Sequence, residues 1–189
     1  MPGAEVEVTA VKKGRKSDPT AVKIEVVEHA DGVTICAVYP SDGAANVCAP
    51  GKGGRMQVRD NDVNVEFRVK VPAGVRFVGR TVNGGIEASG IKADAEAATV
   101  NGGVELDSTG TARAETVNGG ITARLGRADW VGTLKLETVN GGIDVWLPES
   151  LNTEVHASTV NGDISTDFPL TVTGKVKRSE LRSRERGLS

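Results

Sequence analysis

The sequence predicts an all-β protein, and more specifically a β-solenoid of about five repeats that is preceded by a capping region of β-strands. Three observations predict this fold: the composition, a pentapeptide that recurs five times, and the alternation of apolar and polar residues around each copy. The chain has 189 residues, of which 24 are glycine and only 3% are aromatic. This balance, with abundant valine and little leucine, favours short strands separated by turns over a large helical core.

The recurring pentapeptide is TVNGG, which begins at Thr81, Thr99, Thr116 and Thr138, with a fifth copy, TVNGD, at Thr159. Neighbouring copies are 17 to 22 residues apart. A unit of this length with two short strands cannot bury its own apolar side, so it must stack on its neighbours. The repeat therefore predicts a solenoid.

The residues around each copy predict one strand before the turn and one after it. The positions two and four before each Thr are small or apolar, as at Ala95 and Ala97, whereas the position between them is mostly polar. After the turn an apolar residue opens the second strand of each repeat: Ile86, Val104, Ile121, Ile143 and Ile164. Looser turns are expected to follow these second strands, at Ser89-Gly90, Thr109-Gly110 and Leu147-Pro148.

The Asn-Gly pairs are expected to stand above one another at the corners. Successive coils of a solenoid lie about 4.8 Å apart, so stacked Asn side chains can hydrogen-bond along the stack. Glycine suits a sharp corner because it accepts positive φ and has no Cβ, so Gly119→Val is expected to destabilise the fold by more than about 1 kcal/mol and Arg113→Ala to matter little. The predicted ladder consists of Asn83, Asn101, Asn118, Asn140 and Asn161 with Gly84, Gly102, Gly119, Gly141 and Gly162.

A stacked β-hairpin meander is the alternative, because Asn-Gly is also the strongest short hairpin signal. It does not explain why only every second turn is an invariant Asn-Gly while the other turns vary in length. A solenoid explains this if the Asn-Gly corners form one continuous ladder and the other edge varies freely.

The chain is expected to be a single domain, 1–189, in three parts. Residues 1–74 form an N-terminal strand region, with strands near Val6, Val22, Val33 and Val63 and a hairpin turn at 29–32, which would cap one end of the stack. Residues 75–170 form the solenoid, and residues 171–189 a basic tail that is expected to be frayed. An uncapped end would allow self-association.

Cys36 and Cys48 flank a loop rich in Pro, Gly and Asn, where a disulfide could close a short ring; two unpaired thiols are the alternative. The net charge of -2 and the scarcity of aromatic residues argue against nucleic acid as a partner. No apolar run is long enough for a transmembrane helix, and the opening MPGAEVEVTAVKK lacks the apolar segment of a signal peptide.

The sequence contains no HExxH, GxSxG, P-loop or clustered Cys/His motif, so no catalytic, metal-binding or cofactor-binding site is expected. The two histidines, His29 and His156, are far apart in sequence and are interpreted as surface residues. The pentapeptide threonines would form a column, as in ice-binding solenoids. Those proteins need two flat, exposed columns of Thr, so a single column is only weak support for ice binding.

Acidic residues offer the one enzymatic alternative, because carbohydrate-cleaving enzymes also use β-helices. Glu87, Glu105 and Asp144 each follow the first apolar residue of a second strand and would line one face. Paired carboxylates that cleave glycosides need a cleft and aromatic side chains that stack on sugars, and only Trp130 and Trp146 are available. A solvated acidic face is the preferred interpretation.

The repeats TVNGGIEASG, TVNGGVELDSTG, TVNGGITARLG, TVNGGIDVWLP and STVNGDISTDFP resemble a bacterial adhesin-like family of unknown function, whose members carry TVNG- or TVSGD-type repeats on a β-helical scaffold. The resemblance covers most of residues 1–170. It implies an exported envelope protein that is preceded by a signal peptide and closed by a last repeat. Because the chain has neither, it is expected to be an internal piece or a variant reading frame.

The sequence therefore predicts a non-enzymatic cell-envelope or surface protein, an adhesin or scaffold that presents a rigid repeat face to a cell-surface polysaccharide or an envelope protein. A carbohydrate-active β-helix enzyme and a self-assembling structural module are the alternatives. No cofactor is expected.

Overall fold

The structure is a computed structural model that describes residues 5–51, 54–127, 133–149, 164–167 and 181–183. The chain divides into two compact units, Met1–Leu151 and Asn152–Ser189, which are described separately. The helix content is 2%, which confirms the all-β class. No described helix has the length and apolar character needed to cross a membrane.

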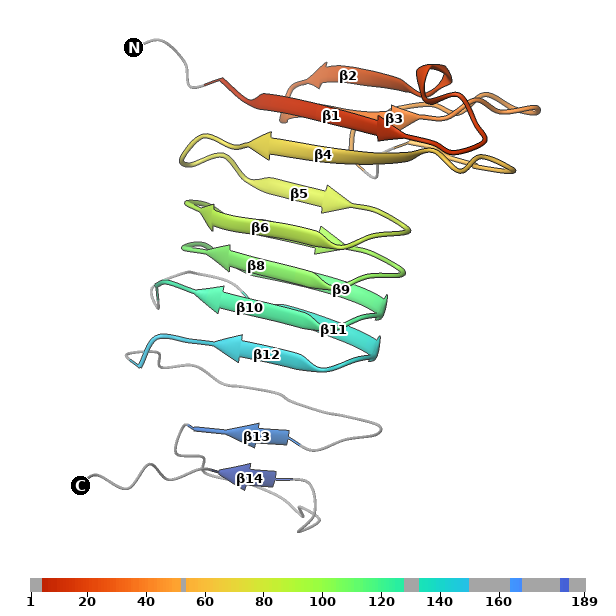
Figure 1. Ribbon diagram of the computed structural model, residues 1–189. Coiled ribbons are helices and arrows are strands. Elements are labelled where there is room, and N and C mark those ends of the chain that lie inside the picture. The colour runs from red at the N-terminus through yellow and green to blue at the C-terminus, as the bar shows by residue number, and fades with distance from the viewer. Residues whose placement is uncertain (1–4, 52–53, 128–132, 150–163, 168–180, 184–189) are drawn as a thin grey trace. The chain divides into compact units, whose positions relative to one another are not determined.

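The repeat region of the first unit forms two parallel sheets of four strands each (Figure 1). One sheet has the order β5-β7-β9-β11 and the other the order β6-β8-β10-β12. The first consists of β5 (Phe77–Arg80), β7 (Ala95–Ala98), β9 (Ala112–Asn118) and β11 (Lys135–Asn140), and the second of β6 (Ile86–Ile91), β8 (Val104–Ser108), β10 (Ile121–Leu125) and β12 (Ile143–Trp146).

This topology confirms the β-solenoid. Thr116 of β9 pairs in parallel with Thr138 of β11, one coil further along, and the strands on either side of an Asn-Gly corner belong to different sheets. The hairpin meander would pair those two strands antiparallel, so it is wrong for these repeats. Four coils lie within the described part of the chain, and the fifth copy, at Thr159, lies outside it.

The core lies between the two sheets and is thin. The β5-β7-β9-β11 sheet contributes alanines to it, and the opposite sheet contributes Val104, Leu106, Ile121 and Leu125. Burial alternates strictly along β8 and β10, as the period of two predicts. Small side chains on one sheet against larger ones on the other allow the two sheets to pack closely.

The looser turns are partly where the sequence places them. β8 ends before Thr109-Gly110, and β12 ends before Leu147-Pro148. The turn expected at Ser89-Gly90 is wrong, because β6 continues to Ile91 and its pairing with β8 shifts register between Ala88 and Ile91. Gly90 has a φ of 65°, which lets the strand carry the extra residue as a bulge.

The N-terminal region contains two antiparallel pairs. β1 (Glu7–Lys13) pairs with β4 (Asn64–Lys70), and β2 (Lys23–His29) pairs with β3 (Gly32–Val38) through a turn at 30–31. One short 3₁₀ helix, η1 (Pro19–Ala21), lies between β1 and β2, and the side chain of Asp18 caps it by accepting from the Thr20 N–H. The four strands and the hairpin agree with the sequence pattern.

The N-terminal region joins the solenoid through the short segment between β4 and β5. In this segment Gly74 donates its N–H to the carbonyl of Lys92 in the first coil (3.2 Å). In the second unit, β13 (Ile164–Thr166) pairs in parallel with β14 (Leu181–Ser183). The rest of the basic tail lies outside the described residues, and the division into 1–74, 75–170 and 171–189 within one domain stays a prediction.

The corners bring backbone into contact with backbone. A Cβ on Gly119 would lie 2.1 Å from the carbonyl oxygen of Gly102, and one on Gly141 would lie 2.1 Å from that of Gly119. Positive φ is found at Gly84 (117°) and Gly102 (154°) but not at the next two corners. The close approach of successive coils, rather than positive φ alone, therefore excludes a side chain here.

The two glycines of one corner provide a matched test. Gly119→Ala is expected to lower the free energy of unfolding by more than about 2 kcal/mol, because its methyl group would overlap the backbone of the preceding coil. Gly120→Ala is expected to cost less than about 1 kcal/mol, because a Cβ there makes an ordinary contact of 3.5 Å with the Gly142 oxygen. Denaturant unfolding of both variants measures the difference, and equal losses would contradict this geometry.

Candidate functional site

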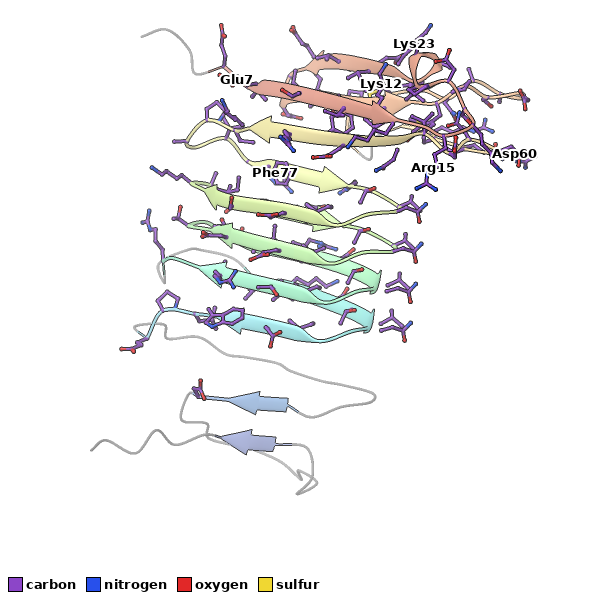
Figure 2. The ribbon with its side chains drawn as sticks, viewed as in Figure 1. Glu7, Lys12, Arg15, Lys23, Asp60 and Phe77 are labelled. Carbon is purple, nitrogen blue, oxygen red and sulfur yellow. A yellow bond between two sulfur atoms is a disulfide. The ribbon has the colours of Figure 1, made fainter. Side chains whose placement is uncertain are left out.

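The asparagines of the corners form a hydrogen-bonded ladder on the outside of the solenoid. Each amide donates its Nδ2 to the Oδ1 of the Asn in the preceding coil, at 2.9 Å in all three described pairs. Figure 2 shows the same side chains repeated at this corner from coil to coil. The ladder runs through Asn83, Asn101, Asn118 and Asn140 with their glycines Gly84, Gly102, Gly119 and Gly141, while Asn161 and Gly162 lie outside the described residues.

The threonines of the same corners point inward. The hydroxyl of Thr99 donates to the carbonyl of Gly84, and that of Thr116 to the carbonyl of Gly102, both at 2.9 Å. Thr99 and Thr116 are each only 5% exposed. These residues are structural parts of the corner, so the Thr column offers no flat exposed face of the ice-binding kind.

The outer face of the β6-β8-β10-β12 sheet carries a row of mostly acidic side chains. Glu87 of β6 pairs in register with Glu105 of β8, and Thr122 of β10 lies between Glu105 and Asp144 of β12. All three carboxylates belong to exposed residues. The structure thus brings together the acidic residues that the sequence analysis placed on one face.

Beside the acidic row, Arg124 and Trp146 pair in register on the same face and bring an aromatic side chain to it. Trp146 is 51% exposed, and the guanidinium of Arg124 lies over its ring at 4.7 Å from the centroid. Arg124 also donates to Glu105. A cation held between an indole ring and a carboxylate fixes the position of both. Trp130, the other tryptophan, lies outside the described residues.

The outer face of the other sheet carries ion pairs. Glu96 of β7 accepts hydrogen bonds from Arg76 (2.8 Å) and Arg80. Partial burial raises the pKa of Glu96, but the hydrogen bond from Arg80 and the charges of both arginines outweigh it, so the pKa lies below its usual value. Further along this face, Lys135 pairs with Glu137 (2.9 Å).

Two hollows lie among the described residues away from the acidic row. One, of about 270 Å³, lies beside Arg76, Asp94 and Arg113. There the backbone N–H of Thr111 donates to the Asp94 carboxylate (2.8 Å), which holds the pKa of Asp94 below its usual value.

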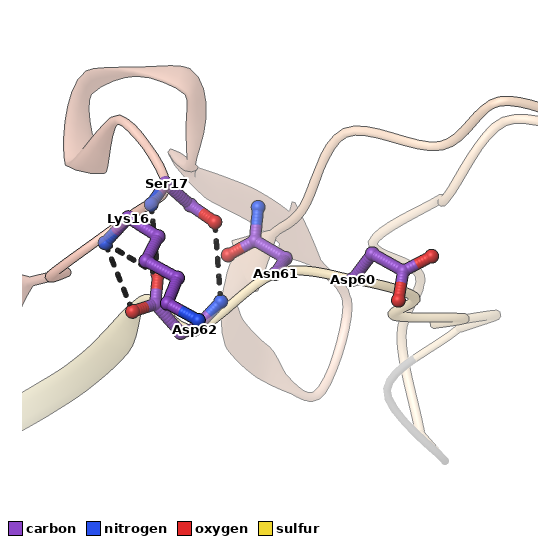
Figure 3. A pocket seen from close by; sticks show the side chains of 5 residues that line it. All are labelled: Lys16, Ser17, Asp60, Asn61 and Asp62. Atoms are coloured by element: carbon purple, nitrogen blue, oxygen red, sulfur yellow. Dashed lines mark hydrogen bonds between the residues drawn. The ribbon is translucent and has the colours of Figure 1, made fainter.

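The other hollow, of about 480 Å³, is lined by Lys16, Ser17, Asp60, Asn61 and Asp62. Figure 3 shows the carboxylate of Asp62 turned toward Lys16 and Ser17, while that of Asp60 points away. Asp62 accepts from the backbone N–H groups of Ser17 (2.8 Å), Lys16 (3.0 Å) and Arg15 (3.1 Å). The hydrogen bond from Ser17 is the largest of the causes that lower the pKa of Asp62 to about 2. This carboxylate ties the β1–β2 loop to the start of β4.

The two cysteines form a disulfide, with 5.8 Å between their Cα atoms. Within the ring that it closes, the nearly buried amide of Asn46 donates to the carbonyls of Tyr39 (2.9 Å) and Gln57 (2.8 Å). The Tyr39 hydroxyl donates to the Val63 carbonyl (2.9 Å), and burial raises the pKa of this tyrosine. Cys36 and Cys48 thus close a loop that is also held by buried polar groups.

The remaining candidates for chemistry do not converge. His29, at the end of β2, shares a hydrogen bond with the Thr34 hydroxyl (3.1 Å), and His156 lies outside the described residues. Among the residues that the structure describes, no group of three or more His, Cys, Asp or Glu side chains could hold a metal ion.

Two features were missed in the sequence: the Asp62 clamp and the contact between Arg124 and Trp146. Asp62 and Ser17 are 45 residues apart, so no local pattern links them. The second contact follows from the spacing of the repeats, because alignment of the copies places Arg124 and Trp146 at equivalent positions.

The Asp62 clamp predicts a pH-dependent contribution to stability. Asp62→Asn is expected to lower the melting temperature at neutral pH, because an amide oxygen accepts the three N–H groups less strongly than a carboxylate does. The folded-state pKa, about 2, lies below the ordinary 3.8, so the contribution is present above the ordinary value and is lost as the pH falls toward 2. The difference in melting temperature should shrink over this range.

Asp60→Asn is the control for this measurement. Asp60 lies in the same loop with a φ of 48°, a conformation that asparagine tolerates, so its replacement should have little effect. A deficit of Asp62→Asn that stays constant on acidification would show that the carboxylate does not act as a clamp.

Comparisons with known proteins show one relationship. Residues 62–187, about two thirds of the chain, match the model of the Toastrack DUF4097 family, a domain of unknown function whose fold is β-helix-like. A search of curated proteins and a search of solved structures each found no match. The matched segment includes the whole of the parallel solenoid described above, so this chain belongs to the Toastrack DUF4097 family.

Proposed function

We propose that this chain is a non-enzymatic scaffold of the bacterial cell envelope, of the adhesin kind, whose solenoid presents the outer face of the β6-β8-β10-β12 sheet to a surface polysaccharide. The observation that carries the proposal is the half-exposed Trp146, which stands on this face next to a row of carboxylates. An indole ring offers an apolar surface for the C–H groups of a sugar ring, and carboxylates accept hydrogen bonds from its hydroxyl groups.

The regularity of the face supports a polymer rather than a small molecule as the ligand. Glu87, Glu105 and Asp144 stand in one row, interrupted by Thr122 of β10, on strands that repeat every 4.8 Å or so. The backbone and the Asn ladder hold this spacing through the coils from Asn83 to Asn140. A partner that is itself periodic can make the same contact on several coils at once, which multiplies weak contacts into useful affinity.

The position of the carboxylates supports a scaffold rather than an enzyme. They lie on an outer sheet face, and neither of the two hollows described above is lined by them. Glycoside cleavage uses two carboxylates on opposite sides of the bond that is cut, which requires walls around the sugar. Glu105 is, in addition, already engaged by Arg124.

The disulfide supports an exported location. Disulfides persist in oxidising compartments and are rare in the bacterial cytosol.

Cys36 and Cys48 should therefore resist alkylation when cells are lysed in the presence of a thiol reagent, and should react only after reduction. Alkylation of both cysteines without a reductant would contradict export.

Binding to a saccharide array tests the function. The full chain is expected to bind at least one bacterial surface polysaccharide, and Trp146→Ala is expected to weaken that binding at least about tenfold, since stacking on an exposed ring carries much of such affinity. Phe67→Ala, at an exposed aromatic residue on β4 outside the solenoid, should leave it unchanged.

Two outcomes would overturn the proposal. One is the absence of binding to any surface polysaccharide, or binding that Trp146→Ala leaves intact. The other is release of sugar products from a bound polysaccharide that stops in Glu87→Gln or Glu105→Gln, which would make the chain a carbohydrate-active enzyme.

A further inference from the structure

The outer face of the β5-β7-β9-β11 sheet is organised as three rows that cross the four strands. The pairing register places one residue of each strand in two of the rows. The third row lies at the corners, where Val82 and Val100 follow the ends of β5 and β7 and each stands one residue before a bridged Asn. Two rows are rich in charge, and the third consists of the valines of the repeated pentapeptide. The first row is Val78, Glu96, Arg113 and Lys135, the second is Arg80, Ala98, Glu115 and Glu137, and the third is Val82, Val100, Val117 and Val139.

The valine row is an exposed apolar strip. Its members are 61%, 39%, 39% and 73% exposed, from Val82 to Val139. The corresponding strands repeat every 4.8 Å or so, which makes the strip roughly 14 Å long. Neither the valines nor the neighbouring Asn ladder carries a charge, in a chain in which 25% of the residues are charged. A contiguous apolar strip with a charged border is typical of an interaction surface.

The order of charges identifies the partner. From β5 to β11, the first row reads neutral, negative, positive, positive, and the second reads positive, neutral, negative, negative. Suppose that the second row faces its own copy with the order of the strands reversed. Arg80 then meets Glu137 at both ends, and Ala98 meets Glu115 in the middle. In the first row the opposite charges meet in the middle, Glu96 against Arg113, and at both ends the neutral Val78 meets the positive Lys135. The face is therefore complementary to itself in reverse order.

We infer that this face binds a second copy of the chain as a two-fold dimer. A two-fold axis that runs parallel to the strands, between β7 and β9, reverses the order of strands and lays each row against its own copy. It places Arg80 opposite Glu137 of the second copy and Glu96 opposite Arg113 of the second copy. The two valine rows then meet along their length, which is the isologous contact that such symmetry requires.

The other two-fold arrangement of this face is excluded by the same rows. An axis along the stack would exchange the two edges of the face and lay the valine row against the first, charged row. Apolar side chains would then desolvate Glu96 and Arg113 without adding an opposite charge from the second copy, which is costly. Only the axis parallel to the strands satisfies both the apolar strip and the charges.

Arg80 and Glu137 remain available to a second copy although they are paired within the chain, whereas Glu96 is paired with Arg76 and Arg80 and its side chain is only 16% exposed. Arg80 donates to Glu96, and Lys135 pairs with Glu137, yet the side chains of Arg80 and Glu137 are 39% and 57% exposed. Charges of this kind at the border of an interface contribute more to its register than to its affinity. The face is also smaller than a standard interface, which buries ~800 Å² per partner, so the dimer is expected to be reversible and to form at high micromolar concentration.

Sedimentation velocity of the full chain, from low micromolar to millimolar concentration, tests the dimer. The wild type should show a monomer–dimer equilibrium, and Val117→Asp should raise the dissociation constant at least about tenfold, because the two introduced carboxylates would lie in the apolar contact. Thr122→Asp, on the outer face of the opposite sheet, should leave the constant unchanged. A monomeric wild type at millimolar concentration, or a dimer that tolerates Val117→Asp, would overturn the inference.

A charge exchange tests the orientation. Arg80→Glu and Glu137→Arg should each weaken the homodimer, because each creates two contacts between like charges. Mixing the two variants should restore a heterodimer, since every contact then joins Glu to Arg, and recovery itself shows that both variants are folded. If the mixture dissociates as readily as either variant alone, the proposed axis is wrong. This face is distinct from the face proposed to bind polysaccharide, so the two proposals can fail separately.

Discussion

The contact between successive backbones at the Asn-Gly corner is the constraint on which the other features of this solenoid depend. Gly119 lies so close to the carbonyl of Gly102 that no side chain fits between them. The same carbonyl accepts the hydroxyl of Thr116 from inside the coil, and the Asn amides join the coils outside it. Each corner is thus held from both sides, and the spacing set there is passed to both sheets. A surface with a fixed repeat follows from this spacing, whatever it binds.

The thin core is a consequence of the same stacking. With Ala112 and Ala114 facing Ile121 and Leu106, a coil buries little apolar area by itself, so its stability must come from its neighbours. Backbone hydrogen bonds between parallel strands and the satisfied polar groups of the corners supply part of that stability. Among the described residues, every buried side-chain nitrogen or oxygen has a hydrogen-bond partner, which fits a structure that depends on polar order more than on a large core.

Much of this architecture could be predicted because the copies of the repeat align with one another residue by residue. Alignment of the copies on Thr116 and its equivalents gave the strands, the side chains that face the core, and the row that contains Glu105. Features that do not repeat were not predictable. A Ser-Gly pair resembles a turn, so a turn was predicted where β6 carries a bulge at Gly90. Asp62 binds a loop 45 residues earlier in the chain, and no local pattern links the two. Two cysteines alone could not decide between a bridge and free thiols.

The repeated Asn-Gly pair also bears on how long the molecule lasts chemically. In a flexible chain this dipeptide is prone to deamidation, in which the glycine nitrogen attacks the asparagine side chain and an aspartate results. In the stack that nitrogen is engaged: Gly84 donates to the carbonyl of Asn101, and Gly102 to that of Asn118, at 2.8 and 2.9 Å. The asparagine amide is held by the next rung as well. Folding therefore protects the Asn-Gly pairs from deamidation. In an unfolded chain each of these pairs would be open to that reaction.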